Sequence, residues 1–360
     1  MTTIAIVGAG LMGTAMAFPL ADNGHSVNLV GTHLDGEIIR SCKESRAHPR
    51  LKRTLPEVVR PFFVEEMDEA LEVAEMVVSG VSSLGVRWIG RTIAPYLRPG
   101  QVILAVTKGL EATADGRLQI MPDVLASELP AGLRESVIQA AIGGPCIAGE
   151  LAGHRPTCVV FGSRHVETLP TLVELFGTSY YHIWTTEDLE GLEYGAALKN
   201  AFALAVGMAD GLLEKAGGVD ETGAAMHNLA ASLFAEGCTE IDRVLEIVGA
   251  TRAYAHGLPG AGDLYVSSRG GRTTRLGRLL GLGHKYRVAR QMLAGETLEG
   301  AEVVRSMARV IPEWVKRGIL AQDELPLLRM LIRVIVEELP ADLGSEAFFG
   351  GSPSLQWVRG

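Results

Sequence analysis

The chain has 360 residues, of which 47% are hydrophobic and 21% are charged. These proportions exclude a disordered or coiled-coil chain, and the length suffices for about two domains. The formal net charge of −9 argues against a general nucleic-acid-binding protein, but it allows a local basic pocket for a small anion.

The four cysteines are scattered, and the nine histidines form no HxxxH-type cluster. We therefore predict reduced thiols and no metal site. The first residues, MTTIAIVGAGLMG, carry no basic segment before the apolar run, so they do not form a signal peptide. Because no uninterrupted apolar segment approaches the ~20 residues that cross a bilayer, we expect a cytoplasmic protein without a membrane span.

Strand-like and helix-like patterns alternate in the first half of the chain. Short apolar runs rich in β-branched residues predict buried strands at 3–8, 25–31, 76–81, 101–107, 138–143 and 157–162. Helical patterns fall between several of them, and the first helix should end at Gly24. This alternation predicts an α/β Rossmann domain with a doubly wound, mainly parallel sheet over residues 1–187.

The pattern changes after about residue 185. Helical periodicity without strand-like runs covers 222–248, 284–294, 299–317 and 323–338. We therefore predict an all-α domain over residues 188–343, followed by a loosely ordered tail at 344–360.

The stretch GAGLMG at residues 8–13 has the spacing GxGxxG between a predicted strand and a predicted helix. Gly8 permits a tight turn, Gly10 lets backbone approach a pyrophosphate, and Gly13 lets the helix pack on the strand. The helix N-terminus then supplies N–H groups to the phosphates. The alternative is a glycine-rich turn that binds nothing.

The end of the second predicted strand bears on the choice between NAD and NADP. An acidic residue there would bind the ribose 2′-hydroxyl, and basic residues would accept a 2′-phosphate. The chain has Gly31-Thr32-His33-Leu34-Asp35, with neither an acid at the tip nor an adjacent arginine. Thr32 and His33 could bind a 2′-phosphate, with help from Arg40 or Lys43. The sequence therefore leaves NAD and NADP as alternatives.

The stretch EYGAALKN at 193–200 combines small residues with a lysine and an asparagine. The small residues predict a helix that packs closely against a neighbour, which we expect to be the cofactor domain. A lysine at such a surface is costly unless it is paired or its pKa falls. Lys199 is therefore a candidate for a chemical role.

Four further segments carry a family resemblance. They are VTKGLE at 106–111, GGPCIAGEL at 143–151, GLEYGAALKNAFALAVGMADGL at 191–212 and GLPGAGDLYVSSRGGRTTRLG at 257–277. In this order behind the glycine loop, they resemble the NAD(P)-dependent glycerol-3-phosphate dehydrogenases, from the loop to about residue 305. The resemblance implies an active site between the two domains, where dihydroxyacetone phosphate and sn-glycerol 3-phosphate are interconverted, supplying the glycerol phosphate backbone of phospholipids.

The resemblance also implies roles for individual residues. The implied catalytic residues are Lys199, Lys108, Asp263 and Asn200. The implied substrate-binding residues are Lys108, Lys199, Asp263, Ser267, Arg272 and Thr273. The implied cofactor-binding residues are Gly8, Gly10, Leu11, Met12, Gly13, Thr32, His33, Lys108, Ala148, Arg272 and Glu299.

The chemistry of ketone reduction agrees with these roles. The reaction needs a hydride donor and a group that protonates the developing alkoxide. A partly buried lysine near another cation suits the second task, because both effects lower its pKa. Lys108 and Arg272 could supply that cation, and Asp263 could orient Lys199.

Each of these residues also has an ordinary structural interpretation. Lys199 could be a solvated helix lysine, Lys108 could simply end a strand, and Asp263 could belong to a turn. Arg272 could be one of several solvated arginines, and Glu299 could stabilise the first turn of a helix.

Two departures from the family pattern bear on the substrate. The family's phosphate-binding arginine is normally followed by asparagine, whereas Thr273 follows Arg272 here, and Ser267-Ser268 stands where Thr-Cys is common. The same chemistry on a different phosphorylated or anionic hydroxy-ketone is therefore an alternative, and a non-catalytic cofactor-binding sensor is another. Base rates among oligomers favour a homodimer.

Overall fold

The run TIAIV forms the central strand β1 (Thr3–Val7), and its residues are buried on alternating faces. Ile4 and Ile6 belong to one hydrophobic core, whereas Ala5 and Val7 belong to a second core. Side chains alternate along a strand, so the two cores lie on opposite faces of the sheet. A strand buried on both faces is expected where helices cover both sides of a parallel sheet.

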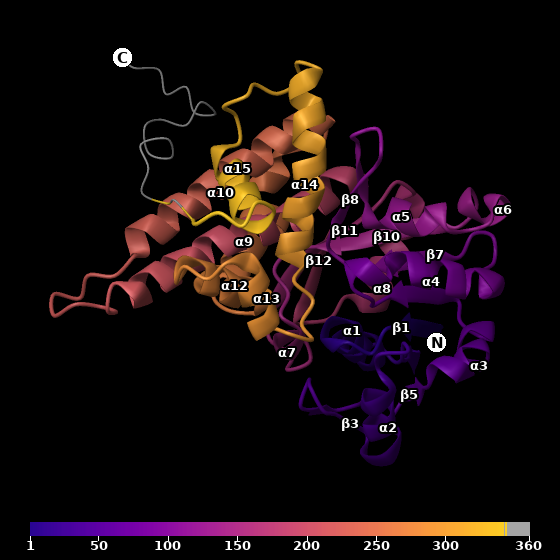
Figure 1. Cartoon of the computed structure of the whole chain (residues 1–360). Helices are drawn as coiled ribbons and strands as arrows, with labels where there is room; N and C mark the ends of the chain where they lie inside the picture. Colours follow the sequence, from indigo (N-terminus) through magenta and orange to yellow (C-terminus); the bar gives the residue numbers. More distant parts are fainter. Residues whose placement is uncertain (342, 344–360) are drawn as a thin grey trace. The chain divides into compact units, whose positions relative to one another are not determined.

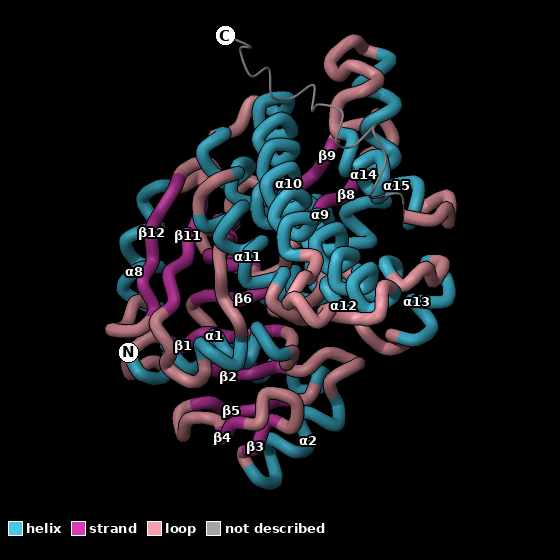
Figure 2. The backbone as a smooth tube through the Cα atoms, turned by 90° about the vertical axis from the view of Figure 1, so that its left-hand side faces the viewer, coloured by secondary structure: helices cyan, strands magenta, loops and turns pink. Residues whose placement is uncertain are grey.

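β1 lies within an eight-stranded sheet of order β12-β11-β10-β7-β6-β1-β2-β5. All neighbours pair in parallel except β10 and β11, which are antiparallel. Figure 2 shows β6, β1, β2 and β5 following one another across the sheet. The other strands of this sheet are β2 (Ser26–Val30), β5 (Val59–Phe62), β6 (Met76–Ser79), β7 (Val102–Ala105), β10 (Ile138–Gly143), β11 (Thr157–Ser163) and β12 (Tyr181–Thr186).

The helices that accompany this sheet are short. They are α1 (Leu11–Asp22), α2 (Gly36–Ser45), α3 (Met67–Glu72), α4 (Val86–Ile93), α5 (Met121–Ser127), α6 (Ala131–Arg134), α7 (Ala148–Leu151) and α8 (Leu169–Phe176). Gly24 follows α1 with a φ of 79°, as predicted for the glycine that ends this helix. The mainly parallel sheet and its helices confirm the predicted Rossmann architecture.

Several strands were not predicted from the sequence, and each omission has a physical reason. β5 contains Pro61, which argues against a strand but is tolerated because β5 lies at the edge of the sheet. β12 is also an edge strand and is largely exposed, so it lacks an apolar run. The hairpins β3 (Ala47–His48) with β4 (Arg53–Thr54) and β8 (Leu110–Ala112) with β9 (Leu118–Ile120) are too short to show a period. The β3–β4 hairpin lies beside β5 and α2 (Figure 2).

The computed structural model describes residues 1–341 and 343, in two compact units (Figure 1). The Rossmann unit comprises residues 1–108 and 120–193, and the helical unit comprises residues 109–119 and the chain from 194 onward. This division differs from the predicted boundary at 187 by the β8–β9 hairpin and by the first turn of the helix that follows β12. The boundary itself stays a prediction, and the predicted tail at 344–360 lies outside the described residues.

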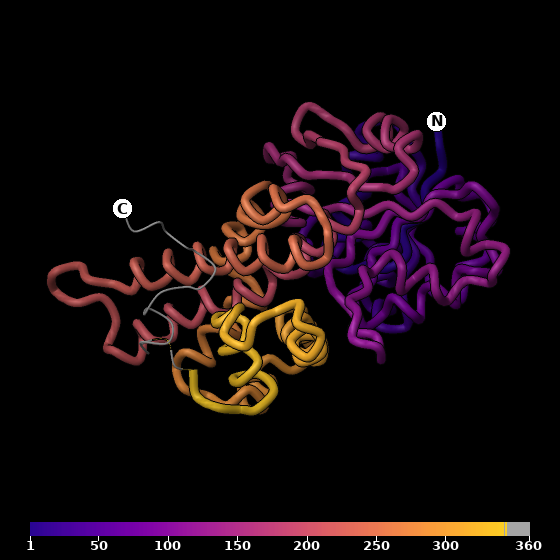
Figure 3. Tube along the Cα trace, turned by 90° about the horizontal axis from the view of Figure 1, so that it is seen from above, coloured from indigo at the N-terminus to yellow at the C-terminus, as the bar shows by residue number. Residues whose placement is uncertain are grey.

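The helical unit is built mainly on one long helix, α9 (Leu189–Lys215), which begins at the end of the Rossmann unit. Its other helices are α10 (His227–Val248), α11 (Asp263–Ser268), α12 (Arg272–Gly281), α13 (Tyr286–Met292), α14 (Glu299–Lys316) and α15 (Pro326–Ile335). α9 and α10 run side by side (Figure 3), and Gly237 of α10 leaves room for the ring of Phe202. α9 and α12 approach closely, because a Cβ on Gly207 would lie 2.5 Å from the Thr274 carbonyl oxygen.

α9 is the one helix in the described part of the chain that is long and apolar enough to cross a membrane. Its most apolar window is 83% buried within the structure. The core helix of a soluble protein has the same length, composition and burial.

Candidate functional site

The GAGLMG loop joins β1 to α1, and two of its glycines are required by backbone packing. Gly8 has a φ of 112°, and a Cβ there would lie 2.6 Å from the carbonyl carbon of Gly80. A Cβ on Gly13 would lie 2.3 Å from the carbonyl oxygen of Gly8. No side chain fits at these distances, so Gly8 and Gly13 hold α1 against β1 and the segment after β6.

Gly10 is different, because nothing in the protein's own packing requires a glycine there. Its φ is −68°, and the nearest atom to a Cβ would be the Gly80 oxygen at 3.9 Å. Gly10 precedes the first turn of α1, which begins with the exposed Leu11 and the half-buried Met12. The open space therefore lies at a helix N-terminus, where N–H groups and the helix dipole favour an anion. This loop fits the pyrophosphate of a dinucleotide.

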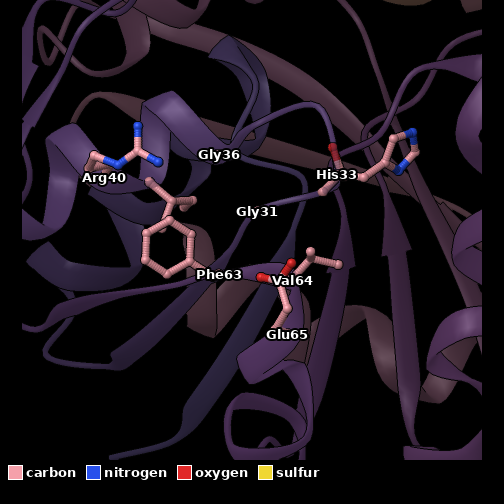
Figure 4. Close-up of a pocket in the computed structure, with 9 residues that line it drawn as sticks. Gly31, His33, Gly36, Arg40, Phe63, Val64 and Glu65 are labelled. Atoms are coloured by element: carbon pink, nitrogen blue, oxygen red, sulfur yellow. The ribbon is translucent and has the colours of Figure 1, made fainter.

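A cavity of about 240 Å³ lies beyond the end of β2. Arg40 and Phe63 lie on one side of it and His33 on the other, with Glu65 between them (Figure 4). Thr32 also lines it. Arg40 forms an ion pair with the exposed Glu37, and such exposed pairs are weak. The guanidinium can therefore turn toward a bound anion at little cost.

Lys108 lies just beyond the carboxyl end of β7. Its ammonium donates a hydrogen bond of 3.3 Å to the carbonyl oxygen of Gly144, which follows the neighbouring strand β10. Thr107 donates to the carbonyl oxygen of Val81, after β6. Ala148 begins the short helix α7 and is buried. The segments TKG and GGPC therefore meet at the edge where parallel strands place ligands.

Glu193 is a buried carboxyl group that sequence reasoning did not single out. Its side chain belongs to the first turns of α9 and is 1% exposed. Neither carboxyl oxygen has a hydrogen-bond partner of normal geometry among the described residues. Burial raises the pKa of Glu193 to about 8, and the Lys108 ammonium and the Met121 backbone amide offset part of this rise. The carboxyl is therefore mainly protonated at neutral pH.

Lys199 forms the best-defined polar cluster of the helical unit. Its Nζ lies 2.6 Å from Oδ1 of Asp263 and 2.6 Å from Oγ of Ser267, and donates to both. Asp263 and Ser267 are four residues apart on α11, so they share one face of that helix. The side chains of Lys199 and Asp263 are only 5% and 4% exposed. The structure thus brings together three residues that were predicted from two separate segments.

The position of Asp263 depends on the glycines of the GLPGAGD segment. Residues Leu258–Gly262 form a single π-helical turn, in which the Gly262 N–H donates to the Gly257 carbonyl oxygen at 3.0 Å. A Cβ on Gly260 would lie 2.3 Å from the Ala255 carbonyl oxygen, so only glycine fits this turn. Such turns occur often at functional sites. Here the turn leads directly into α11 and sets Asp263 at its first position.

The small residues of EYGAALKN pack within the helical unit. A Cβ on Gly195 would lie 3.5 Å from Pro259 and 3.6 Å from Tyr254. Gly195 therefore packs closely against the segment that precedes α11, and the expected packing of this stretch against the cofactor domain stays a prediction.

A second group of predicted residues surrounds the start of α14. A Cβ on Gly300 would lie 2.5 Å from the Asn200 carbonyl oxygen and 3.0 Å from Cγ2 of Thr273. Glu299, the first residue of α14, is thus next to this contact. Asn200 is 4% exposed, and its amide nitrogen has no partner among the described residues. A buried donor without a partner needs an explanation, and a bound ligand would supply one.

Arg272 begins α12, immediately after two glycines that turn the chain. Gly270 and Gly271 have φ values of 151° and 103°, which favour glycine. Arg272 itself is exposed, beside Thr273.

The predicted residues of the helical unit form two clusters. The first contains Lys199, Asp263 and Ser267. The second contains Asn200, Thr273 and Glu299. The adjacent positions of Lys199 and Asn200 on α9 link the two clusters.

Two further residues near the glycine loop were missed. Asp35 accepts a hydrogen bond from the Ala9 backbone N–H, and His48 contacts the Ala9 carbonyl oxygen. The sequence carries a weak signal for Asp35, because this residue follows β2. In dinucleotide-binding folds, an acid that binds the ribose commonly lies after the second strand. His48 gave no signal, because its contact partner lies 39 residues away in the sequence.

Comparisons with known proteins cover nearly the whole chain. Residues 3–169 match the family model described as NAD-dependent glycerol-3-phosphate dehydrogenase N-terminus. Residues 188–344 match the corresponding C-terminus model. The two matched ranges include every residue of the glycine loop and of the Lys199 cluster.

Individual relatives agree with this match. An NADP(+)-dependent glycerol-3-phosphate dehydrogenase from Archaeoglobus fulgidus is 38% identical over 280 residues, covering 78% of this chain and 80% of that protein. A glycerol-3-phosphate dehydrogenase [NAD(P)+] from Agathobacter rectalis is 32% identical over 347 residues, covering 95% and 94%. The crystal structure of glycerol-3-phosphate dehydrogenase from Coxiella burnetii aligns with a TM-score of 0.78 at 26% identity, covering 97% and 98%.

Proposed function

Because the chain belongs to the NAD-dependent glycerol-3-phosphate dehydrogenase family, we propose that it interconverts dihydroxyacetone phosphate and sn-glycerol 3-phosphate with NAD or NADP. The observation that carries the proposal is the buried cluster of Lys199, Asp263 and Ser267. A buried ion pair costs desolvation and is weak evidence for a stabilising role. A role in chemistry accounts for its retention in the core of the unit.

The Rossmann unit supplies the nucleotide site. The open space at Gly10 and the N-terminus of α1 take the pyrophosphate, and the cavity lined by Thr32, His33 and Arg40 takes the adenosine end. When bound, the nicotinamide supplies or accepts the hydride. The residues of this unit bind and orient the nucleotide.

Lys199 is the group that handles the proton. In the direction of ketone reduction, the substrate oxygen gains a proton from the Lys199 ammonium as its negative charge develops. Asp263 holds that ammonium in one orientation through the 2.6 Å bond. In the reverse direction, neutral Lys199 removes the proton from the alcohol.

Arg272 binds the substrate phosphate, with Asn200 and Thr273 beside it. An arginine offers two parallel N–H donors to phosphate oxygens, which a lysine cannot do. The orphaned amide of Asn200 supplies a further donor. Thr273 is shorter than the asparagine of the family pattern, so a larger phosphorylated hydroxy-ketone is the alternative substrate.

NADP is the preferred cofactor in this proposal. A carboxylate that selects NAD must be available to the ribose 2′-hydroxyl. Asp35 Oδ2 is instead engaged by the backbone N–H groups of Ala9 and Thr32 and by the Thr32 hydroxyl. Arg40 then provides a cation for a 2′-phosphate.

The same proposal places the protein in the cytoplasm, where it supplies glycerol phosphate for phospholipids. A homodimer stays a prediction.

The test compares phosphorylated and unphosphorylated substrates. Wild-type protein should oxidise NADPH with dihydroxyacetone phosphate, followed as loss of reduced-nicotinamide absorbance. Arg272→Ala should lower kcat/KM for this substrate on the order of a hundredfold, because a charge-assisted contact is lost. Its effect with dihydroxyacetone should be small. Equal losses on the two substrates would remove Arg272 from phosphate binding, and an inactive wild-type protein that still binds NADPH would favour the sensor alternative.

A further inference from the structure

Ala9, the residue between the first two glycines of the loop, is held on both sides by side chains. Ala9 is fully buried, and its backbone N–H donates to Oδ2 of Asp35 at 3.2 Å. Its carbonyl oxygen lies 2.9 Å from Nε2 of His48. One residue of the loop therefore has its donor and its acceptor fixed by groups from two other segments, the end of β2 and the β3 hairpin.

The hydrogen bonds around His48 determine its tautomer. The Leu51 backbone N–H lies 2.9 Å from Nδ1 and donates to it, so Nδ1 is the acceptor. Nε2 must then carry the proton and donate to the Ala9 carbonyl oxygen. The side chain is fully buried, which lowers the pKa of His48 and favours this neutral form.

Asp35 is held as firmly as His48. Its Oδ2 also accepts the Thr32 backbone N–H at 2.9 Å and the Thr32 hydroxyl at 2.8 Å. The Asp35 backbone N–H in turn donates to the Thr32 carbonyl oxygen. Three donors thus engage Oδ2 of the carboxylate, and they hold Asp35 at the N-cap of α2.

We propose that His48 and Asp35 are positioning residues, which lock the two peptide planes beside Ala9 and so aim the Gly10 N–H at the nucleotide pyrophosphate. The Ala9 carbonyl and the Gly10 N–H belong to one planar trans peptide, so they point in opposite directions. His48 holds the oxygen, and the N–H is thereby turned away from the protein interior at His48. Among the described residues, no backbone acceptor receives the Gly10 N–H. This inference rests on the proposed use of a dinucleotide.

The arrangement makes nucleotide binding sensitive to acid. Protonation of His48 would place a second N–H against the Leu51 N–H. It would thereby disrupt the hydrogen bonds that hold the imidazole against Ala9. Asp35 raises the pKa of His48 and Arg50 lowers it, but burial has the largest effect and lowers it. Arg53 of β4 lies opposite His48 in the hairpin register. Because the pKa of His48 lies below its ordinary value of 6.5, nucleotide affinity should be constant near neutral pH and fall only in acid.

The test uses two substitutions that each keep half of the imidazole's contacts. His48→Gln places an amide donor at the reach of Nε2, so it can still bond Ala9. His48→Asn places an oxygen near Nδ1, so it can still accept from Leu51 but cannot reach Ala9. NADPH affinity is measured by fluorescence titration of the intact protein, together with the melting temperature.

We expect His48→Asn to weaken NADPH binding about tenfold, as expected for loss of one well-placed hydrogen bond, and His48→Gln to stay near wild type. Asp35→Ala should weaken binding to a similar degree. His25→Asn is the control, because His25 also accepts a backbone N–H, from Thr2 at 3.3 Å, and this bond lies outside the loop. In wild type the affinity should fall in acid, and in His48→Gln it should not.

Two results would overturn the inference. One is an equal NADPH affinity in both His48 variants and wild type, with melting temperatures lowered equally, since His48 would then act on stability alone. The other is a wild-type affinity that does not change in acid relative to His48→Gln, a comparison that holds even if His48→Asn fails to fold. Wild-type protein that binds no nucleotide at any pH would overturn the proposed cofactor, and this inference with it.

Discussion

The residue that we propose for proton transfer, Lys199, is a buried cation with a buried anion beside it. The pair spans 64 residues of sequence and is almost inaccessible to solvent. Removing one partner of such a pair typically costs about 3–5 kcal/mol, because the other charge is left buried alone. Activity and folding must therefore be measured separately for any variant at this position.

Lys199→Ala should lower kcat at least a hundredfold while leaving NADPH affinity within a few-fold of wild type. The reason is that the proposed proton transfer acts in the transition state, which affects kcat more than nucleotide binding. Steady-state kinetics and fluorescence titration measure the two effects, with circular dichroism as a check of folding. Lys215→Ala, an exposed lysine on the same helix, serves as the control. A near-normal kcat in folded Lys199→Ala would exclude the lysine from the mechanism.

Glu193 offers a test of stability against pH. Its pKa is raised from the ordinary value of 4.5 to about 8, so the folded protein binds more protons than the unfolded chain between these values. The carboxyl's contribution to stability is thus fully present below about pH 4.5 and is lost as the pH rises toward 8.

Glu193→Gln should therefore stabilise the protein at alkaline pH, because the neutral amide keeps the shape and cannot ionise. The melting temperature at pH 9 should rise by a few degrees relative to wild type, with little difference at pH 5. The control is Glu187→Gln, an exposed carboxyl just before α9. A variant that is less stable than wild type at pH 9 would contradict a buried, mainly neutral carboxyl.

At the scale of elements, the β1–loop–α1 unit separates two uses of glycine that the sequence cannot distinguish. Gly13 is needed because backbone lies 2.3 Å from its missing Cβ, whereas a Cβ on Gly10 would meet no atom closer than 3.9 Å. The same pattern GxGxxG therefore contains glycines that packing requires and one, Gly10, that we propose for the ligand. Each can be tested with the same small change to alanine.

Gly13→Ala should destabilise the protein by about 1–3 kcal/mol through the clash with Gly8, the range found for overpacked cores. Gly10→Ala should leave the melting temperature nearly unchanged and weaken NADPH binding at least tenfold, since the methyl group occupies the space kept for pyrophosphate. Thermal unfolding and fluorescence titration measure the two properties. If Gly10→Ala binds NADPH normally, the open space is not the phosphate site.

At the scale of the whole molecule, cofactor choice should appear as a difference in thermal stability. A ligand that binds only the folded state at a hundred times its Kd stabilises by about 2.7 kcal/mol. The proposed site predicts a larger shift with NADP than with NAD at equal concentrations, because Arg40 meets the additional phosphate.

Arg40→Ala should remove most of that NADP advantage, lowering NADP affinity roughly tenfold and leaving NAD affinity unchanged. Arg60→Ala is a matched control, because Arg60 is an exposed arginine on the neighbouring edge strand β5. Melting curves with each nucleotide measure the effect. A loss of the same size for NAD and NADP would place Arg40 outside the 2′-phosphate site.

The sequence by itself determined the class of fold and the family. Local patterns sufficed for this: strand runs such as TIAIV, the glycine loop followed by a helix, and helical periodicity after residue 185. Each depends on residues that are near one another in the chain, so the pattern is visible without the fold. The start of α14 at Glu299 and the end of α10 at Val248 agree with the predicted helices for the same reason.

Only the tertiary structure decided which of the candidate residues meet. Lys199 reaches Asp263 because a π-helical turn sets the start of α11, and no periodicity reveals that turn. His48 reaches Ala9 through a hairpin whose strands are two residues long, and Glu193 is neutral because its surroundings exclude water. Contacts between distant segments and the burial of a charge are properties of the packed chain. For this reason the sequence indicated most of the candidate residues but missed Asp35, His48 and Glu193, which only the fold places near them.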